Sequence, residues 1–108
     1  MTGHRRRVVW LLLAFDLPVT SKAQRKAAAN FRLRLLDEGF EMAQFSVYLR
    51  YCGSKSVAAA HIKRVSQRLP SSGKVDILQF TDKQYENIVS FDNRGRKKLS
   101  NPSQYQLF

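Results

Sequence analysis

The sequence predicts an α+β sandwich of the ferredoxin-like kind, with the order βαββαβ and an additional C-terminal strand. Strand-like and helix-like segments alternate along the chain, and no segment repeats another. The chain has 108 residues, the size of one domain. Hydrophobic residues make up 44% of it, which is enough to build a core. Two layers joined by right-handed crossovers satisfy this order, with both helices on one face of the sheet.

The first strand is expected at Val8–Phe15, a continuous apolar run rich in β-forming residues. Such a run is typical of a strand at the centre of a sheet, buried on both faces. It ends before Pro18, because proline cannot donate to a strand ladder. This run is also the longest apolar stretch of the chain, and a membrane span needs roughly 18 residues. The sequence therefore excludes a transmembrane protein, and we expect no membrane partner.

The first helix is expected to be capped by Thr20 or Ser21 and to run to about Glu38, where Gly39 stops it. Four residues at helical spacing form the expected buried stripe, namely Ala27, Ala28, Phe31 and Leu35. The basic residues of the helix point largely elsewhere, and no acid offsets them before Asp37. This helix therefore presents a basic outer surface near the end of the first strand.

The next segment, Phe40–Tyr51, alternates in polarity, which is typical of a strand. The expected apolar face consists of Ala43, Phe45, Val47, Leu49 and Tyr51. The expected polar face consists of Gln44, Ser46, Tyr48 and Arg50. The alternation does not decide between one long strand and two short strands that meet near Gln44.

A second helix is expected at about Val57–Leu69, started by Ser54 or Ser56. One side of it would carry Val57, Ala60, His61, Arg64, Val65 and Leu69. A general base at His61 is one reading of this helix. We favour a surface or semi-buried packing residue, because a single histidine on a largely helical stripe more often has that role.

Two further strands are expected after the turn Pro70–Gly73, at Lys74–Phe80 and at Ile88–Phe91. These strands complete a ferredoxin-like domain that we place at residues 1–91. Residues 92–108 form a basic C-terminal tail that contains an interaction strand.

One face of the predicted sheet stays uncovered, because both helices lie on the other face. Trp10 and the leucines around it favour burial of this face. We expect a homodimer that packs sheet against sheet.

The chain carries 19 Lys and Arg against 8 Asp and Glu, a formal net charge of +11. Such a charge attracts polyanions, above all the phosphates of duplex DNA or RNA. The residues expected to bind nucleic acid are Arg25, Lys26, Arg32, Arg34, Tyr48, Arg50, Arg94, Arg96, Lys97 and Lys98. A network of interface hydrogen bonds is the alternative role for the two residues on the polar strand face, Tyr48 and Arg50.

The single cysteine, Cys52, cannot form an internal disulfide, which fits a reducing cytoplasm. We interpret it as a small packing residue. One cysteine and two distant histidines also exclude a zinc site of the four-ligand kind.

The acidic residue that stands out is Asp16, which ends the buried first strand. A turn-starting aspartate before a proline is its simplest interpretation. A twofold axis would instead bring two copies of Asp16 together, and two carboxylates can hold Mg²⁺ or another divalent cation. A metal held in this way can activate water against a phosphodiester. Asp16 is therefore the candidate catalytic residue and the candidate metal ligand.

Four short motifs together resemble one known family. The first half holds Phe15-Asp16-Leu17-Pro18, the basic pair Arg25-Lys26 and the helix stop Gly39-Phe40. The second half holds Gln44-Phe45-Ser46-Val47-Tyr48. This combination resembles the small CRISPR-associated protein two family, the companion of the CRISPR integrase in spacer acquisition. The ending Gln106-Leu107-Phe108 resembles variants found beside single large effector nucleases.

The resemblance implies a ferredoxin-like homodimer in which the two copies of Asp16 face each other. Some members are metal-dependent endonucleases that act on RNA or DNA. In others the subunit serves as a scaffold that bridges two integrase dimers, and we expect the tail residues Tyr105, Leu107 and Phe108 to bind this partner. Some members carry an arginine two residues before the glutamine that corresponds to Gln44, and this chain has Met42 at that position. The alternative is a stand-alone, toxin-like module of the same fold that binds or cleaves RNA.

Overall fold

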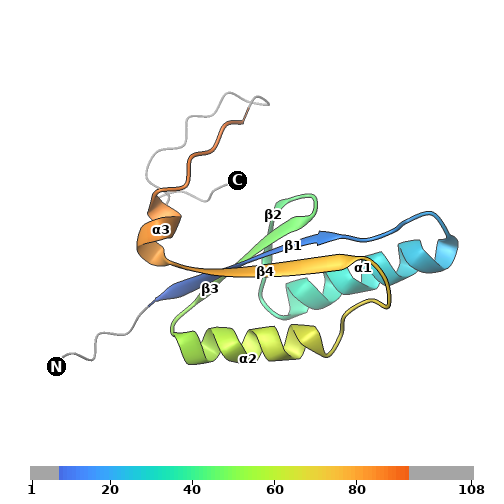
Figure 1. Cartoon of the computed structure of the whole chain (residues 1–108), viewed down its shortest axis with the longest axis horizontal. Coiled ribbons are helices and arrows are strands. Elements are labelled where there is room, and N and C mark those ends of the chain that lie inside the picture. Colours follow the sequence, from blue (N-terminus) through green and yellow to red (C-terminus); the bar gives the residue numbers. More distant parts are fainter. Residues whose placement is uncertain (1–7, 93–108) are drawn as a thin grey trace.

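A computed structural model describes residues 8–92 of the chain (Figure 1). They form four strands and three helices, in the order β1 (Val9–Asp16), α1 (Lys22–Asp37), β2 (Glu41–Gln44), β3 (Val47–Cys52), α2 (Lys55–Ser66), β4 (Lys74–Thr81) and α3 (Asp82–Glu86). The strands make one sheet in the order β2-β3-β1-β4, in which all neighbours are antiparallel. The predicted α+β fold is confirmed, and it fits the ferredoxin-like arrangement.

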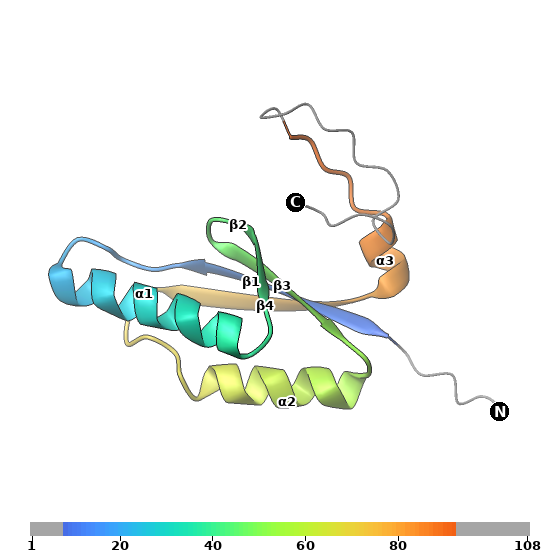
Figure 2. The same ribbon diagram turned by 180° about the vertical axis from the view of Figure 1, so that it is seen from behind.

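The two faces of the sheet differ in what covers them. Alternate residues of the central strand β1 are buried, from Val9 to Phe15. They pack with side chains of α1 and α2, among them Phe31 and Val65. Both long helices therefore cover one face, which we call the helix face (Figure 2). The opposite face, which we call the open face, carries the other residues of β1 and, among the helices of residues 8–92, the short α3 alone.

Helix α1 begins where its capping residues were expected. The Ser21 side chain accepts a hydrogen bond from the Gln24 backbone, and the Gln24 side chain accepts one in return from the Ser21 backbone. This reciprocal arrangement satisfies two amide groups that a helix start leaves unpaired. The helix ends at Glu38, and Gly39 follows with a φ of +92°. Of the expected stripe Ala28, Phe31 and Leu35 are buried, whereas Ala27 is exposed.

Helix α2 is shorter than expected and is rotated relative to the predicted stripe. Its buried residues are Ala58, His61 and Val65, whereas Val57 and Leu69 are exposed. The N-cap is Ser54, whose hydroxyl accepts from the Val57 backbone. The helix thus begins at Lys55, two residues before the expected start, and its buried stripe begins at Ala58 instead of Val57.

The segment after α1 forms two strands, β2 and β3, separated at Phe45 and Ser46. Pairing with β1 places Tyr48 opposite Leu13 and Arg50 opposite Leu11, and directly opposed residues share a face. The predicted polar face is therefore the helix face. The prediction that Tyr48 contacts nucleic acid is wrong, because its ring lies in the core and is only 2% exposed.

The expected strand at Ile88–Phe91 is also wrong, because residues 88–92 form no strand in the described part of the chain. A second capping box, between Thr81 and Gln84, starts helix α3 directly after β4. This turn leads the chain away from the sheet edge, and Phe91 is 91% exposed. Among residues 8–92, none of the helices combines the length and the apolar character that crossing a bilayer requires.

Candidate carboxylate site and nucleic-acid interface

Asp16 is the last residue of β1 and is exposed. Alternation along the strand places it on the open face, with Trp10, Leu12 and Ala14, while Phe15 beside it enters the core. The rigid central strand thus presents one carboxylate at its end, on the face that α1 and α2 leave uncovered.

Sequence reasoning missed a second acid on the same face, Asp76 of β4. It pairs in register with Ala14, and Lys74 pairs with Asp16. The Lys74 ammonium lies 3.5 Å from an Asp76 carboxylate oxygen, and both side chains are exposed. In the strand Lys74–Phe80, odd-numbered and even-numbered residues point to opposite faces of the sheet. Once the pairing of this strand with β1 is known, that alternation places Asp76 on the same face as Asp16.

A divalent cation fits the carboxylate chemistry of this edge. The described residues contain no group of three His, Cys, Asp or Glu side chains that could hold a metal by themselves. Mg²⁺ does not need such a cage, because it usually binds one or two carboxylates and keeps waters and substrate phosphates. One exposed Asp16 from each of two copies of the chain would meet that requirement.

The rest of the open face is apolar. Leu12, Leu49 and Phe80 lie on it with Trp10 and Tyr85, which belong to one cluster. Leu78 of β4 pairs in register with Leu12 and is 55% exposed. A face of this kind is typical of a surface that a partner covers.

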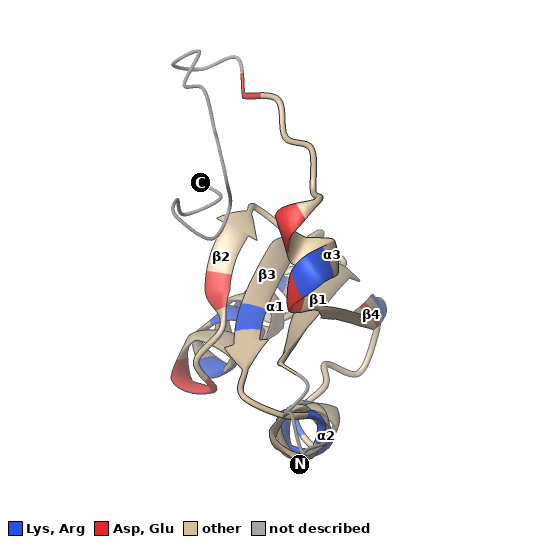
Figure 3. Ribbon diagram, turned by 90° about the vertical axis from the view of Figure 1, so that its left-hand side faces the viewer, with Lys and Arg blue, Asp and Glu red and all other residues tan. Residues whose placement is uncertain are grey.

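The basic residues of α1 differ in how far they are engaged. Arg25 donates from Nη1 to the Thr20 carbonyl at 3.0 Å and to the Val19 carbonyl at 3.3 Å, so it braces the loop that follows β1. Lys26 and Arg34 are exposed, and among residues 8–92 neither has an acidic partner. Figure 3 shows Lys and Arg on both long helices. Binding of phosphates by Arg25, Lys26 and Arg34 stays a prediction.

Arg32 is the most buried of these cations. Its guanidinium carbon lies 5.4 Å from the centre of the Phe15 ring and 4.7 Å from that of the Phe45 ring. Its Nε is buried without a hydrogen-bond partner. Phosphate binding by Arg32 also stays a prediction.

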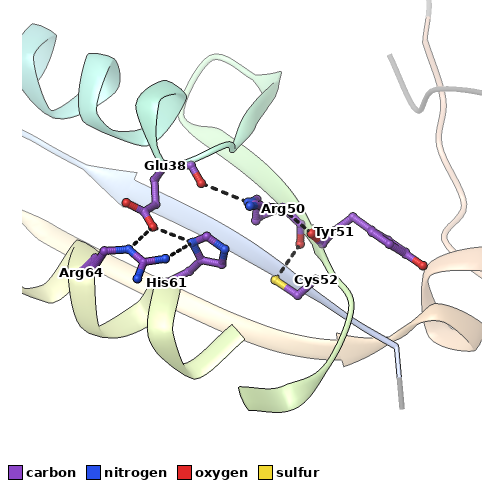
Figure 4. Close-up of polar contacts among 6 residues, drawn as sticks. All are labelled: Glu38, Arg50, Tyr51, Cys52, His61 and Arg64. Carbon is purple, nitrogen blue, oxygen red and sulfur yellow. Dashed lines mark hydrogen bonds and ion pairs between the residues drawn. The ribbon is translucent and has the colours of Figure 1, made fainter. Parts of the chain in front are cut away.

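Arg50 serves the fold instead. Its Nε donates to the Glu38 carbonyl at 3.0 Å and its Nη1 to the Tyr51 carbonyl at 2.6 Å (Figure 4). The first of these bonds pairs the Glu38 carbonyl, one of the carbonyl groups that the end of α1 leaves without a partner in the helix. Arg50 thus has a helix-capping role, and its contact with nucleic acid stays a prediction.

A polar cluster that the sequence did not predict joins the two long helices. His61 Nδ1 donates to a Glu38 carboxylate oxygen at 2.6 Å, and Arg64 Nε donates to the same oxygen at 2.5 Å (Figure 4). Burial alone would raise the pKa of Glu38, but the hydrogen bonds and charges of Arg64 and His61 outweigh it and lower that pKa. The packing role predicted for His61 is confirmed, and Glu38 is the partner that makes its burial possible.

The single cysteine, Cys52, lies in the core. Cys52 is fully buried, and burial raises the pKa of its thiol although the charge of Arg50 partly offsets this effect. The predicted packing role of Cys52 is confirmed.

The predicted tail contacts lie outside the described residues. They are the nucleic-acid contacts Arg94, Arg96, Lys97 and Lys98 and the partner contacts Tyr105, Leu107 and Phe108.

The fold of this chain has a counterpart among solved structures. A structure described as "Crystal structure of cas2" matches 85% of this chain and 97% of its own, with a TM-score of 0.57 at 16% identity, and thus shares the fold. The family model of the CRISPR associated protein Cas2 matches residues 9–88. The chain belongs to the Cas2 family.

Two relatives extend this match over nearly the whole chain. A "CRISPR-associated endoribonuclease Cas2" of Paracidovorax avenae is 51% identical over 100% of this chain and 99% of its own length. A protein of the same name from Flavobacterium psychrophilum is 43% identical over 94% of this chain and 88% of its own length.

Proposed function

We propose that this Cas2-family chain is a homodimeric, divalent-metal-dependent endoribonuclease with Asp16 as its catalytic carboxylate. The observation that carries the proposal is the position of Asp16, exposed at the end of a buried strand on the open face. The names of the two relatives support the reaction class, since both are called endoribonucleases. The CRISPR family also favours this role over a stand-alone, toxin-like RNA module.

The homodimer would form through the open face. Half-exposed Leu78 and its neighbour Leu12 gain the free energy of apolar burial when a second copy covers them. A twofold axis near the end of β1 would place two Asp16 carboxylates around one shared position.

The metal of this site is proposed to be Mg²⁺, held by Asp16 of each subunit. When bound, it supplies positive charge to the scissile phosphate and lowers the pKa of a coordinated water. The chain itself contributes the rigid placement of Asp16 and the cationic side chains Lys26 and Arg34, which attract the phosphate backbone.

The test is cleavage of single-stranded RNA and of DNA by the wild type and by Asp16→Asn, with Mg²⁺ and with a chelator. Asp16→Asn should lose cleavage and keep binding, because the amide removes the anionic ligand and leaves the basic surface intact. Asp76→Asn is the matched control on the same face and should retain cleavage. Cleavage by Asp16→Asn at the wild-type rate would overturn the proposal, as would wild-type activity that a chelator does not change.

A second proposed function is to bridge two integrase dimers during spacer acquisition. The observation in its favour is the net charge of +11. This charge is larger than a nuclease cleft alone would require, and it suits binding to the phosphates of a duplex. We place this activity in the cytoplasm, where the buried thiol of Cys52 stays reduced. Tyr105, Leu107 and Phe108 would contact the integrase.

Deletion of the residues after Asn101 tests this second function. The shortened chain should lose capture of the integrase in a pull-down while it stays a dimer in sedimentation. Capture at the wild-type level would contradict it. Asp16→Asn in an integration assay separates the two functions, since bridging does not require the carboxylate.

A further inference from the structure

An exposed aromatic ring stands in the turn between β2 and β3. Phe45 is 74% exposed, although a ring of this size gains free energy from burial. The sequence pattern assigned it to the apolar strand face with Val47 and Leu49. In the structure it falls between the two strands and leaves that face. Its position therefore is not explained by the core or by the sheet.

The ring of Phe45 lies against a cationic side chain. The guanidinium of Arg32 lies over it at 4.7 Å, and the same guanidinium lies over the ring of Phe15 at 5.4 Å. Phe15 is anchored in the core by contact with Phe31 and Tyr48. A cation held between two rings is fixed in orientation, so Arg32 stiffens the turn that carries Phe45.

Arg32 also keeps unused hydrogen-bonding capacity. Its Nε is buried without a partner, and no side-chain or backbone acceptor among residues 8–92 binds its guanidinium. A guanidinium has five donors in a planar fork that matches a phosphate. The stacked cation is thus equipped to bind an anion next to the Phe45 ring.

The turn lies at the same end of the sheet as the candidate catalytic carboxylate. The Phe15 backbone N–H donates to the Ser46 carbonyl at 3.1 Å, which ties the turn to the residue directly before Asp16. A nucleotide bound at Phe45 would therefore be close to the end of β1.

We propose that Phe45 and Arg32 form a binding site for one unpaired nucleotide of single-stranded nucleic acid. The base stacks on the exposed face of the Phe45 ring, and Arg32 binds an adjacent phosphate. An aromatic face next to a cation is the common platform for single strands, because every base has a π-face to stack. A duplex keeps its bases stacked on one another and cannot use this ring. The inference rests on the proposed nuclease function and adds to it a substrate contact outside the carboxylate site.

The test compares the affinity for a short oligoadenylate with that for a duplex of equal length. Both are measured by fluorescence anisotropy without divalent metal, so that neither is cleaved. Phe45→Ala should weaken single-strand binding by about 5-fold to 150-fold and change duplex binding by less than about twofold. Phe45→Trp should retain single-strand binding. Val89→Ala is the matched control, since Val89 is 75% exposed and has no assigned role.

Two further readouts report on each half of the site. A 2-aminopurine base in the strand should be quenched by the wild type and by Phe45→Trp, but not by Phe45→Ala, because quenching requires stacking. Arg32→Gln should reduce the slope of log affinity against log salt for single strands by about 0.7, the loss of one phosphate contact.

Three results would overturn the inference. The first is unchanged single-strand binding in Phe45→Ala, or an equal loss for the duplex. The proposed function would survive that result. The second is a wild type that binds the duplex but no single strand, which would also confine the proposed nuclease to duplex substrates. The third is a shift of Phe45→Ala from dimer to monomer in sedimentation, which would assign the ring to a subunit contact. A wild type that binds no nucleic acid would instead remove the proposed function together with the inference.

Discussion

The indole ring of Trp10 stacks on the phenol ring of Tyr85, with centroids 3.8 Å apart and an angle of 4° between the planes. The indole Nε1 also donates to an Asp82 carboxylate oxygen at 2.9 Å. Through these contacts the short helix α3 covers the end of the open face where β1 begins (Figure 1). The other end, which carries Asp16, is not covered by α3, and the proposed homodimer would place a second subunit there.

Tyr85→Ala should destabilise the fold by about 3 kcal/mol, because it removes a ring that is only 5% exposed. Since Trp10 is the only tryptophan, its fluorescence should shift to the red when the stack is lost. Urea unfolding followed by this fluorescence measures both effects. Tyr85→Phe keeps the ring and should change little; an equal loss in Tyr85→Phe would mean that the hydroxyl, not the stack, stabilises α3.

Leu78→Lys should weaken the homodimer. Leu78 is 55% exposed in one chain, and the substitution would bury an unpaired ammonium in the proposed interface. We expect the dimer dissociation constant to rise by about tenfold to a hundredfold in sedimentation equilibrium, with cleavage falling in parallel. Leu33→Lys is the matched control, because Leu33 is 59% exposed on α1, in the layer that covers the helix face. A dimer that is unchanged in Leu78→Lys would place the interface elsewhere.

Glu38 should make the fold sensitive to acid. Its folded pKa lies below its ordinary value of 4.5, so the carboxylate contributes stability above pH 4.5. That contribution is lost as the pH falls through the folded pKa. Glu38→Gln should lower the free energy of unfolding at neutral pH by about 1 kcal/mol and flatten its decline in acid.

Urea unfolding of Glu38→Gln at a series of pH values measures this effect. Asp37→Asn is the control, since Asp37 is exposed and no ion pair holds it among the described residues. A decline in acid that is as steep in Glu38→Gln as in the wild type would assign the acid sensitivity to other carboxylates.

Gly39→Ala should destabilise the fold by about 1 kcal/mol or more. The backbone at Gly39 has a φ of +92°, and an added Cβ would lie 2.7 Å from the Arg50 Nε. The Arg50 side chain can shift, but the backbone strain remains. Gly53→Ala, with nothing within 4 Å of its Cβ, should change stability by less than about 0.5 kcal/mol. Equal effects of the two substitutions in urea unfolding would contradict this account.

The elements with strong local signals were predictable from the sequence. The apolar run at Val8–Phe15 became the central strand, and Ser21 became the N-cap of α1. A helix cap can be predicted from the sequence because the residues that form its hydrogen bonds are only three positions apart. The exposed Asp16 at the end of that strand was predictable for the same reason.

The errors arose where a distant partner decides which face a residue takes. The alternation of its own strand predicts that Tyr48 lies on the polar face. Its pairing opposite Leu13 instead places the Tyr48 ring in the core. No local pattern around His61 indicates its hydrogen bond to Glu38, because Glu38 lies 23 residues away in the sequence. The strand expected at Ile88–Phe91 is absent from the described residues, because no neighbouring strand pairs with this segment after α3.

The central claim is that two copies of Asp16 meet across the open face of a homodimer. Spin labels on Asp16→Cys test it through the dipolar distance between subunits, since the native Cys52 is buried and stays unlabelled. We predict one narrow distance, shorter than that from labels on Leu33→Cys in the outer helical layer. A longer distance from position 16 than from position 33, or no dipolar coupling in a confirmed dimer, would contradict the account.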